Sequence, residues 1–199
     1  MDIAGPMIPF WLKATYTAYV AITLPIYFRK YGPGNFLWFS DIALIGTVAA
    51  LWLESPLLAG MMLIAILLPE LLWNISFFAG LLTGRSISGL ADYMFDKDLP
   101  LWLRALSLFH IFLPILLLWL IHQLGYDANA LFIQTCVAWI VLPLTYWLTN
   151  PAENVNWVHG PAGKKQAHMP PLLYLALLML VFPLLVYFPA HLLLQAVFG

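Results

Sequence analysis

A carboxylate and a carboxamide lie inside one of the most apolar stretches of this 199-residue chain. Residues 67–78 read LLPELLWNISFF and carry Glu70 and Asn74, which share a face if the stretch is helical. Pro69 removes a backbone donor just before them and predicts a kink at that level. An ionisable group at membrane depth is costly unless it faces a protein interior or a water-filled cavity. The stretch therefore predicts a membrane protein with a polar interior.

Polar side chains on other predicted spans reach a similar depth. Depth is counted at about 1.5 Å per residue from the end of each span that carries the basic residues. Asp41 then lies about 9 Å deep with Ser40 beside it, and His110 lies about 12 Å deep. Asn74 lies about 13 Å deep and Glu70 is deeper, near the midplane. We expect Asp41, Asn74 and His110 to point inward and to lie within about 10 Å of one another, close enough to couple directly or through water.

Three kinds of chemistry fit these residue types. A histidine near a hydroxyl can run nucleophilic hydrolysis, with His110 as base and Ser40 as nucleophile. In that reading Asp41 orients or charges the site, and Glu70 and Asn74 polarise the substrate or order water. Two carboxylates and an imidazole can instead hold a metal ion, although no HExxH or paired-cysteine motif is present. The third reading is a buried hydrogen-bond network that only fixes helix packing.

Composition places the chain in a membrane. It is 63% hydrophobic and 9% charged, whereas a soluble domain carries about 25% charged residues. This small number of charged residues cannot cover a surface exposed to water, and we therefore expect lipid to be the main solvent. The net charge is −1 and no basic stripe is present, which argues against nucleic acid as a partner. The single cysteine, Cys136, excludes an internal disulfide.

Six apolar runs are long enough to cross about 30 Å of hydrocarbon. They cover 9–28, 35–53, 56–83, 101–124, 128–149 and 171–197. We predict an all-α integral membrane bundle of six transmembrane helices that forms one polytopic domain over 1–199. Apolar residues recur at helical spacing between 84 and 100, which predicts a short interfacial helix there. Prolines in most of the spans favour kinked helices around a cavity.

Basic residues predict the orientation. With six spans, the connections 29–34, 84–100 and 150–170 lie on one side of the membrane. They hold all of the Lys and Arg residues except Lys13 and Arg104, and Arg104 lies just beyond the second of them. This bias predicts that these connections are cytoplasmic and that both termini lie on the other face of an inner (plasma) membrane. Lys13 is expected to snorkel to that other face.

Several further polar residues receive an interpretation from their position. Tyr16, Thr23 and Tyr27 form a stripe on the first span, which we interpret as interhelical hydrogen bonding. His122 and His191 are interpreted as interfacial, because both fall near the non-cytoplasmic face. In the connection 150–170, Asn154 and Asn156 are expected to bond to local backbone. Trp157 and His159 are then placed over the mouth of the cavity.

Some of these residues resemble a known family. Tyr31-Gly32 followed by Phe36-Leu37-Trp38-Phe39 and Asp41 is similar to the second span of the androgen-induced membrane hydrolase family, which includes the androgen-dependent TFPI-regulating protein type. Phe109-His110 followed by Leu113-Pro114 resembles the span that carries that family's catalytic histidine. The resemblance implies a polytopic enzyme that hydrolyses fatty-acid esters of hydroxy fatty acids with a threonine and a histidine. His110 matches the histidine, whereas Trp38 stands where the family has its threonine, so Ser40 is the nearest hydroxyl.

The whole chain, with Asn154-Val155-Asn156-Trp157, also resembles an uncharacterised family of bacterial polytopic membrane proteins. The leading functional hypothesis is an intramembrane hydrolase or acyl-transfer enzyme on a lipid-like ester, with Ser40, Asp41, Glu70, Asn74 and His110 as its site. Membrane lipids are the expected partners, and the sequence leaves open whether a cofactor is bound. One alternative is a non-catalytic subunit of a larger membrane complex. Another is a pathway for a small solute or proton, based on Glu70 at the midplane.

Overall fold

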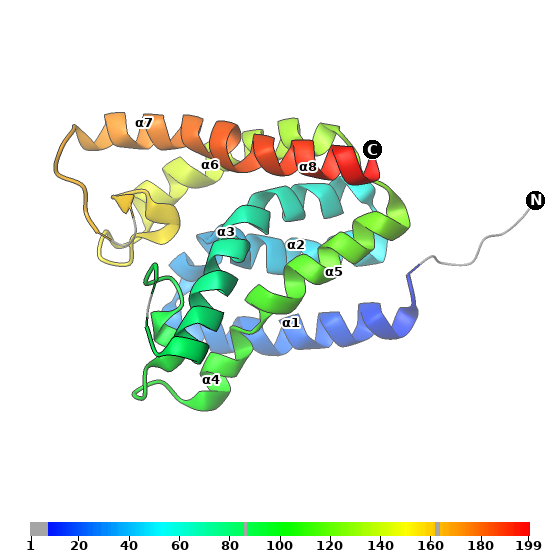
Figure 1. Ribbon diagram of the computed structural model, residues 1–199, viewed down its shortest axis with the longest axis horizontal. Helices are drawn as coiled ribbons and strands as arrows, with labels where there is room; N and C mark the ends of the chain where they lie inside the picture. Colours follow the sequence, from blue (N-terminus) through cyan, green and yellow to red (C-terminus); the bar gives the residue numbers. More distant parts are fainter. Residues whose placement is uncertain (1–7, 86, 162–163) are drawn as a thin grey trace, which may run out of the picture.

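The computed structural model describes residues 8–85, 87–161 and 164–199, and all regular elements among them are helical, as predicted (Figure 1). The α-helices are α1 (Phe10–Tyr31), α2 (Phe39–Leu53), α3 (Pro56–Thr83), α4 (Leu101–Leu106), α5 (Phe109–Leu124), α6 (Asn129–Leu148), α7 (Pro171–Val181) and α8 (Phe188–Phe198). Three short elements are 3-10 turns: η1 (Pro33–Leu37), η2 (Asp92–Phe95) and η3 (Val155–Trp157). A π-helical element, η5 (Phe182–Tyr187), joins α7 to α8.

Each predicted apolar run contains a helix, and four helical segments are long and apolar enough to cross a membrane. These segments are 56–83, 101–124, 129–148 and 171–198. Helix α2 has 15 residues, which is about 22 Å of helix, and α1 carries Lys13 and several hydroxyl side chains along its length. The structure therefore supports a membrane-embedded helical protein with four candidate spans, and the count of six stays a prediction.

Helix α3 lies at the centre of the bundle and packs against α2, α5 and α6 (Figure 1). In its most apolar window 56% of the residues are buried, against 17% for the α7–α8 segment. Its first half is buried on all sides, from Ala59 to Ile66. Polar groups in the second half of α3 are therefore held in the middle of the protein, with neighbouring helices on several sides.

Prolines free backbone carbonyls, and side chains from other helices bond to two of them. Pro114 has no N–H to donate to the carbonyl of His110, four residues earlier in α5. Asn74 Nδ2 on α3 donates to that oxygen at 2.7 Å. Pro183 similarly cannot bond to the carbonyl of Met179, which accepts from Trp139 Nε1 at 2.8 Å. These bonds replace the missing helical ones, as an apolar surrounding requires.

The polar stripe on α1 makes interhelical hydrogen bonds, as predicted, through its tyrosines. Tyr16 donates from its hydroxyl to the Leu44 carbonyl of α2 at 2.8 Å. The Tyr27 hydroxyl lies 2.9 Å from Ser107 Oγ, at the junction of α4 and α5. Thr23 instead bonds within its own helix. The two tyrosines thus attach α1 to the bundle at two levels.

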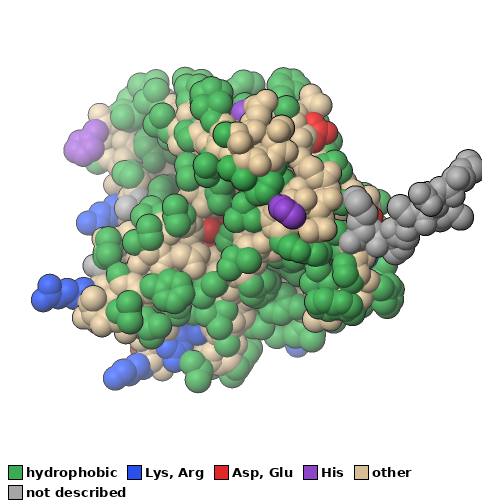
Figure 2. Space-filling model, turned by 45° about the vertical axis from the view of Figure 1, so that its right-hand side comes forward, with side chains coloured by type: hydrophobic (Ala, Val, Ile, Leu, Met, Phe, Trp, Pro, Cys, Tyr) green, Lys and Arg blue, Asp and Glu red, His purple; other side chains and the backbone are tan. Residues whose placement is uncertain are grey.

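Most of the basic residues gather at one end of the molecule, at the left of Figure 2. The residues of this end are exposed in the three predicted cytoplasmic connections: Arg29, Lys30, Arg85, Lys97, Lys164 and Lys165. Lys13 is buried and its Nζ lies 2.7 Å from Glu54 Oε1 in the turn between α2 and α3, and its location at the other membrane face stays a prediction. The first seven residues, on which the location of the N-terminus depends, lie outside the described part of the chain.

His122 is exposed, so its interfacial interpretation stays a prediction, whereas His191 is buried within the protein. His191 is buried on α8, and its Nδ1 lies 2.7 Å from the hydroxyl of Tyr126. Tyr126 belongs to the short connection between α5 and α6. The histidine therefore contributes a polar contact between α8 and this connection instead of facing the membrane surface.

The connection 84–100 differs from the predicted interfacial helix. Between its described residues the only helical element is the four-residue turn η2. Gly84 and Gly89 adopt left-handed backbone angles, with φ of 68° and 76°, which interrupt an α-helix. Arg104 donates from Nη1 to the Met94 carbonyl at 2.7 Å, and Ala91 and Met94 pack against Trp73 of α3. The apolar residues of this segment thus cover the end of α3.

The connection between α6 and α7 is fixed by two buried asparagines. Asn154 bonds locally, as predicted, accepting from the His159 backbone N–H at 2.9 Å and donating to the Gly160 carbonyl at 2.8 Å. The prediction for Asn156 was wrong, because its amide reaches the start of α2. It accepts from the Phe39 N–H at 3.1 Å and donates to the Leu37 carbonyl at 2.7 Å. Asn156 therefore caps α2 from more than one hundred residues away.

We predict that Asn156→Ala lowers the free energy of unfolding by about 2–3 kcal/mol. The change removes a helix cap, worth about 0.5–2 kcal/mol, and leaves a buried carbonyl unpaired. Thermal unfolding in detergent measures the loss. Asn150→Ala is the control, because Asn150 is exposed and its side chain accepts from the nearby Ala152 N–H. Equal stability of the two variants would contradict the role of Asn156 as a distant cap.

Candidate functional site

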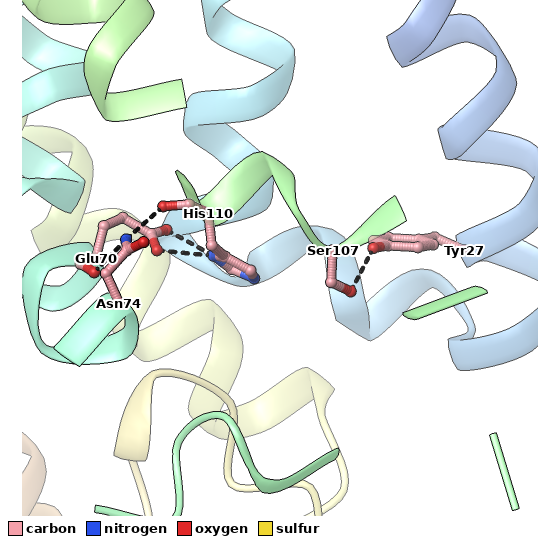
Figure 3. Close-up of polar contacts among 5 residues, drawn as sticks. All are labelled: Tyr27, Glu70, Asn74, Ser107 and His110. Atoms are coloured by element: carbon pink, nitrogen blue, oxygen red, sulfur yellow. Dashed lines mark hydrogen bonds and ion pairs between the residues drawn. The ribbon is translucent and has the colours of Figure 1, made fainter. Parts of the chain in front are cut away.

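The centre of the polar interior is a direct contact between Glu70 on α3 and His110 on α5 (Figure 3). Both carboxylate oxygens of Glu70 lie 2.8 Å from Nδ1 of the imidazole. The Glu70 side chain is 3% exposed and that of His110 is 14% exposed. A carboxylate this close to Nδ1 favours a proton on that nitrogen, which leaves Nε2 as the basic position of a neutral ring. Among the described residues, no hydrogen bond reaches His110 Nε2.

Asn74 holds the two helices in register at this contact. Its Nδ2 donates to the Glu70 carbonyl at 2.8 Å, one turn earlier on α3, and to the His110 carbonyl at 2.7 Å. The expected convergence of Asn74 and His110 is therefore confirmed by contact (Figure 3). Asn74 bonds the backbone of the histidine, whereas Glu70 bonds its ring. The position and the rotation of the imidazole are thus both fixed from α3.

Aromatic side chains and η2 cover the pair. The Trp73 ring stacks on the His110 ring with centroids 4.7 Å apart, and Phe77 stacks on Trp73 at 5.2 Å. Tyr93 of η2 lies beside Trp73 with ring centroids 6.4 Å apart. Burial raises the pKa of Tyr93 well above its ordinary value, and the nearby Glu70 charge adds to this shift. The phenol therefore stays protonated and can donate a hydrogen bond at the edge of the site.

Asp41 is buried in the first turn of α2, next to the site but not bonded to its histidine. Its Oδ1 accepts from Asn35 Nδ2 at 3.1 Å, and its charge lies within electrostatic range of Glu70. Helices α2 and α5 are in contact, so Asp41 belongs to the same polar region. The group that orients the imidazole is Glu70, whereas the sequence interpretation gave this role to Asp41. The expected distance of about 10 Å between Asp41 and His110 stays a prediction.

Ser40 is half-buried at the start of α2. Among the described residues, no hydrogen bond joins Ser40 to His110. Its role as nucleophile therefore stays a prediction.

Ser107 is a hydroxyl beside the histidine that the sequence interpretation missed. It precedes His110 by three residues, so both side chains lie on one side of the chain, and the His110 N–H donates to the Ser107 carbonyl at 3.2 Å. Ser107 is buried, and its Oγ lies 2.9 Å from the Tyr27 hydroxyl. In Figure 3, the imidazole lies between Glu70 on one side and the Ser107–Tyr27 pair on the other. The spacing of three residues between Ser107 and His110 was the sequence feature that could have identified this hydroxyl.

A metal centre is not built from these groups. Among the described residues, no cluster of three or more His, Cys, Asp or Glu side chains is arranged to hold a metal ion. Asp41 bonds Asn35, and Glu70 presents both oxygens to one imidazole nitrogen. Neither the hollow beside His159 and Tyr174 nor the open groove beside Leu24 and Phe36 is lined by Glu70 or His110. The site is a compact acid–base pair within packed helices.

We predict that Asn74→Leu destabilises the protein by about 1–3 kcal/mol, because it leaves the His110 carbonyl without a donor in an apolar surrounding. In a Pro114→Ala background the new N–H of residue 114 can donate to that carbonyl. The cost of Asn74→Leu should then be smaller, and a double-mutant cycle by thermal unfolding measures the difference. Additive effects of the two changes would argue that Asn74 does not compensate for the proline.

Comparison with known protein families, curated proteins and solved structures finds no match to this chain.

Proposed function

We propose that this chain is an intramembrane hydrolase or acyl-transfer enzyme on a lipid-like ester, with His110 as its general base and acid. The observation that carries the proposal is the Glu70–His110 pair, with both carboxylate oxygens 2.8 Å from Nδ1 and no hydrogen bond at Nε2 from the described residues. A base oriented by a third group on its far nitrogen is the arrangement that activates a hydroxyl for attack on a carbonyl.

In this mechanism His110 takes a proton on Nε2 and Glu70 stabilises the imidazolium that forms. The activated oxygen attacks the ester carbonyl, and the imidazolium returns its proton to the leaving alcohol. The acyl group then passes to water or to a second alcohol by the same steps. Tyr93, which stays protonated and lies near Glu70, is placed to donate to a developing oxyanion.

Two serines compete for the role of nucleophile. Ser40 lies beside Asp41 on α2, and Ser107 lies one turn before His110 with its hydroxyl bonded to Tyr27. Tyr27 can donate to Ser107 Oγ, which leaves the serine proton free to point elsewhere. Trp73 and Phe77 stack in sequence over the imidazole, so an ester that reaches Nε2 would meet an apolar surface beside the base.

Purified protein assayed with a panel of lipid esters tests the proposal. His110→Ala and Glu70→Gln should each lower kcat by about 10²–10⁴-fold, as loss of general acid–base catalysis does. Removal of the true nucleophile by Ser40→Ala or Ser107→Ala should abolish turnover, whereas the other serine variant should keep it. His122→Ala, an exposed histidine near the opposite end, is the control. Activity that survives His110→Ala in folded protein would sink the assignment.

We also propose that all six apolar runs span an inner (plasma) membrane, with the basic connections cytoplasmic, both termini on the other side and 84–100 lying at the cytoplasmic interface. The gathering of exposed Lys and Arg at one end supports this orientation. In a Cys136→Ala background, single cysteines at positions 164 and 199 should be labelled by a membrane-impermeant reagent from opposite sides of the membrane. Labelling of both from outside intact cells would overturn the topology.

A further inference from the structure

A small polar hollow lies between the ends of α6 and α7, apart from the Glu70–His110 pair. It has a volume of about 170 Å³. Five of the eight residues in its wall carry side chains able to hydrogen-bond, and the wall consists of Tyr146, Pro151, Val158, His159, Lys165, Gln166, Pro171 and Tyr174. These residues come from the end of α6, the connection after it and the first turn of α7. The hollow thus lies at the end of the molecule where the basic residues gather.

The charge of this hollow has one sign. Lys165 is the only Lys, Arg, Asp or Glu in its wall. His159 stacks on Tyr146 with ring centroids 4.8 Å apart, and its Nε2 is buried without a hydrogen-bond partner among the described residues. Burial lowers the pKa of His159, and the Lys165 ammonium lowers it further. A cation and an unsatisfied ring nitrogen in one wall are groups that an anionic oxygen would satisfy.

The segment that leads into Val158 and His159 of the wall has an unusual backbone conformation. Asn154, Asn156 and Trp157 have φ of 45°, 50° and 60°, a left-handed region that non-glycine residues rarely adopt. The two asparagines keep this shape through their four side-chain bonds to backbone, and the Tyr174 hydroxyl donates to the Trp157 carbonyl at 3.0 Å. Such strain persists where the surrounding structure enforces it, and it is concentrated at ligand sites.

Exposed apolar residues flank the hollow on both helices. Trp147 and Leu148 follow Tyr146 on α6 and are 66% and 69% exposed, and Leu172 and Leu173 follow Pro171 on α7 and are 60% and 50% exposed. In a membrane these side chains contact acyl chains. Basic pockets between membrane helices at the cytoplasmic side are suited to anionic lipid headgroups.

We propose that this hollow binds the phosphate group of an anionic phospholipid headgroup, with Lys165 as its charge partner and His159 and the tyrosines as hydrogen-bonding partners. The lipid's acyl chains would lie along the exposed apolar residues of α6 and α7. This site does not depend on the proposed hydrolase activity, because no residue of its wall belongs to the Glu70–His110 pair.

The test uses the full chain in a non-ionic detergent, with binding followed by thermal stabilisation. Dioctanoyl phosphatidylglycerol carries the phosphate and the chains, dioctanoylglycerol carries the chains alone, and glycerol 3-phosphate carries the phosphate alone. We expect phosphatidylglycerol to bind at least about five-fold more tightly than dioctanoylglycerol. This is about the gain in affinity that one lysine near an anionic lipid provides. Lys165→Gln should remove this preference, and His159→Phe, which keeps the ring stacked on Tyr146, should weaken it.

Lys164→Gln is the matched control, because Lys164 is an adjacent exposed lysine outside the wall of the hollow. It should leave the preference unchanged. Unfolding temperatures without ligand that match the wild type show that each variant is folded. Stabilisation by glycerol 3-phosphate as well would mean that the site accepts any phosphate ester, and stabilisation by the lipid alone would mean that the chains are required. No preference for phosphatidylglycerol in the wild type, or equal losses in the two lysine variants, would overturn the proposal.

Discussion

The bond from Asn74 to the carbonyl of His110 is the contact on which the polar interior depends. In lipid, water cannot satisfy a carbonyl that a proline has freed, so another part of the protein must do it. Pro114 creates this need on α5, and Asn74 on α3 meets it at 2.7 Å. The same asparagine bonds the Glu70 carbonyl at 2.8 Å. One side chain therefore sets how far α5 is shifted along α3, and with it the height of the imidazole beside the carboxylate.

A structural role and a catalytic role of the Glu70–His110 pair differ in what they require of Nε2 of the imidazole. A pair that only joined two helices would use its polar atoms for bonds within the protein. Nδ1 is satisfied by both oxygens of Glu70, whereas the described residues offer no hydrogen bond to Nε2. The ring is also stacked on Trp73, so it is held in one orientation. An oriented imidazole with one open nitrogen is the form required of a general base.

Much of the helix arrangement could be predicted from the sequence, because hydropathy and span length act locally. The predicted range 56–83 matches α3, and 101–124 matches α4 with α5. Counting residues along each span also predicted that Asn74 and His110 lie at the same depth, and in the structure Asn74 donates to the His110 carbonyl. What the sequence could not supply was the partner of each polar group. Asn156 caps α2 across the bundle, Lys13 pairs with Glu54, and both contacts depend on which helices are neighbours.

The role of Glu70 was misjudged for the same reason. Its spacing from Asn74 predicts a shared face on α3, but that face could have met α2 with Asp41 as easily as α5 with His110. The choice is made by packing. Helix α3 lies against α5 along the half that carries the polar residues, and η2 packs beside this contact through Met94 and Trp73. The connection 84–100 has the apolar spacing of an interfacial helix. Two left-handed glycines fold it over α3 instead, because the buried faces of Trp73 and Phe77 are a better partner for those side chains than the membrane surface.

Asn156 also links the two regions to which we assign functions. It bonds Leu37 and Phe39 at the start of α2, two residues before Asp41, while its own segment forms the strained connection beside the hollow at α6 and α7. A shift of that connection cannot leave the start of α2 unchanged, because both polar atoms of the Asn156 side chain are bonded to it. The hollow between α6 and α7 and the polar interior are therefore joined through the Asn156 amide, and its replacement would affect both.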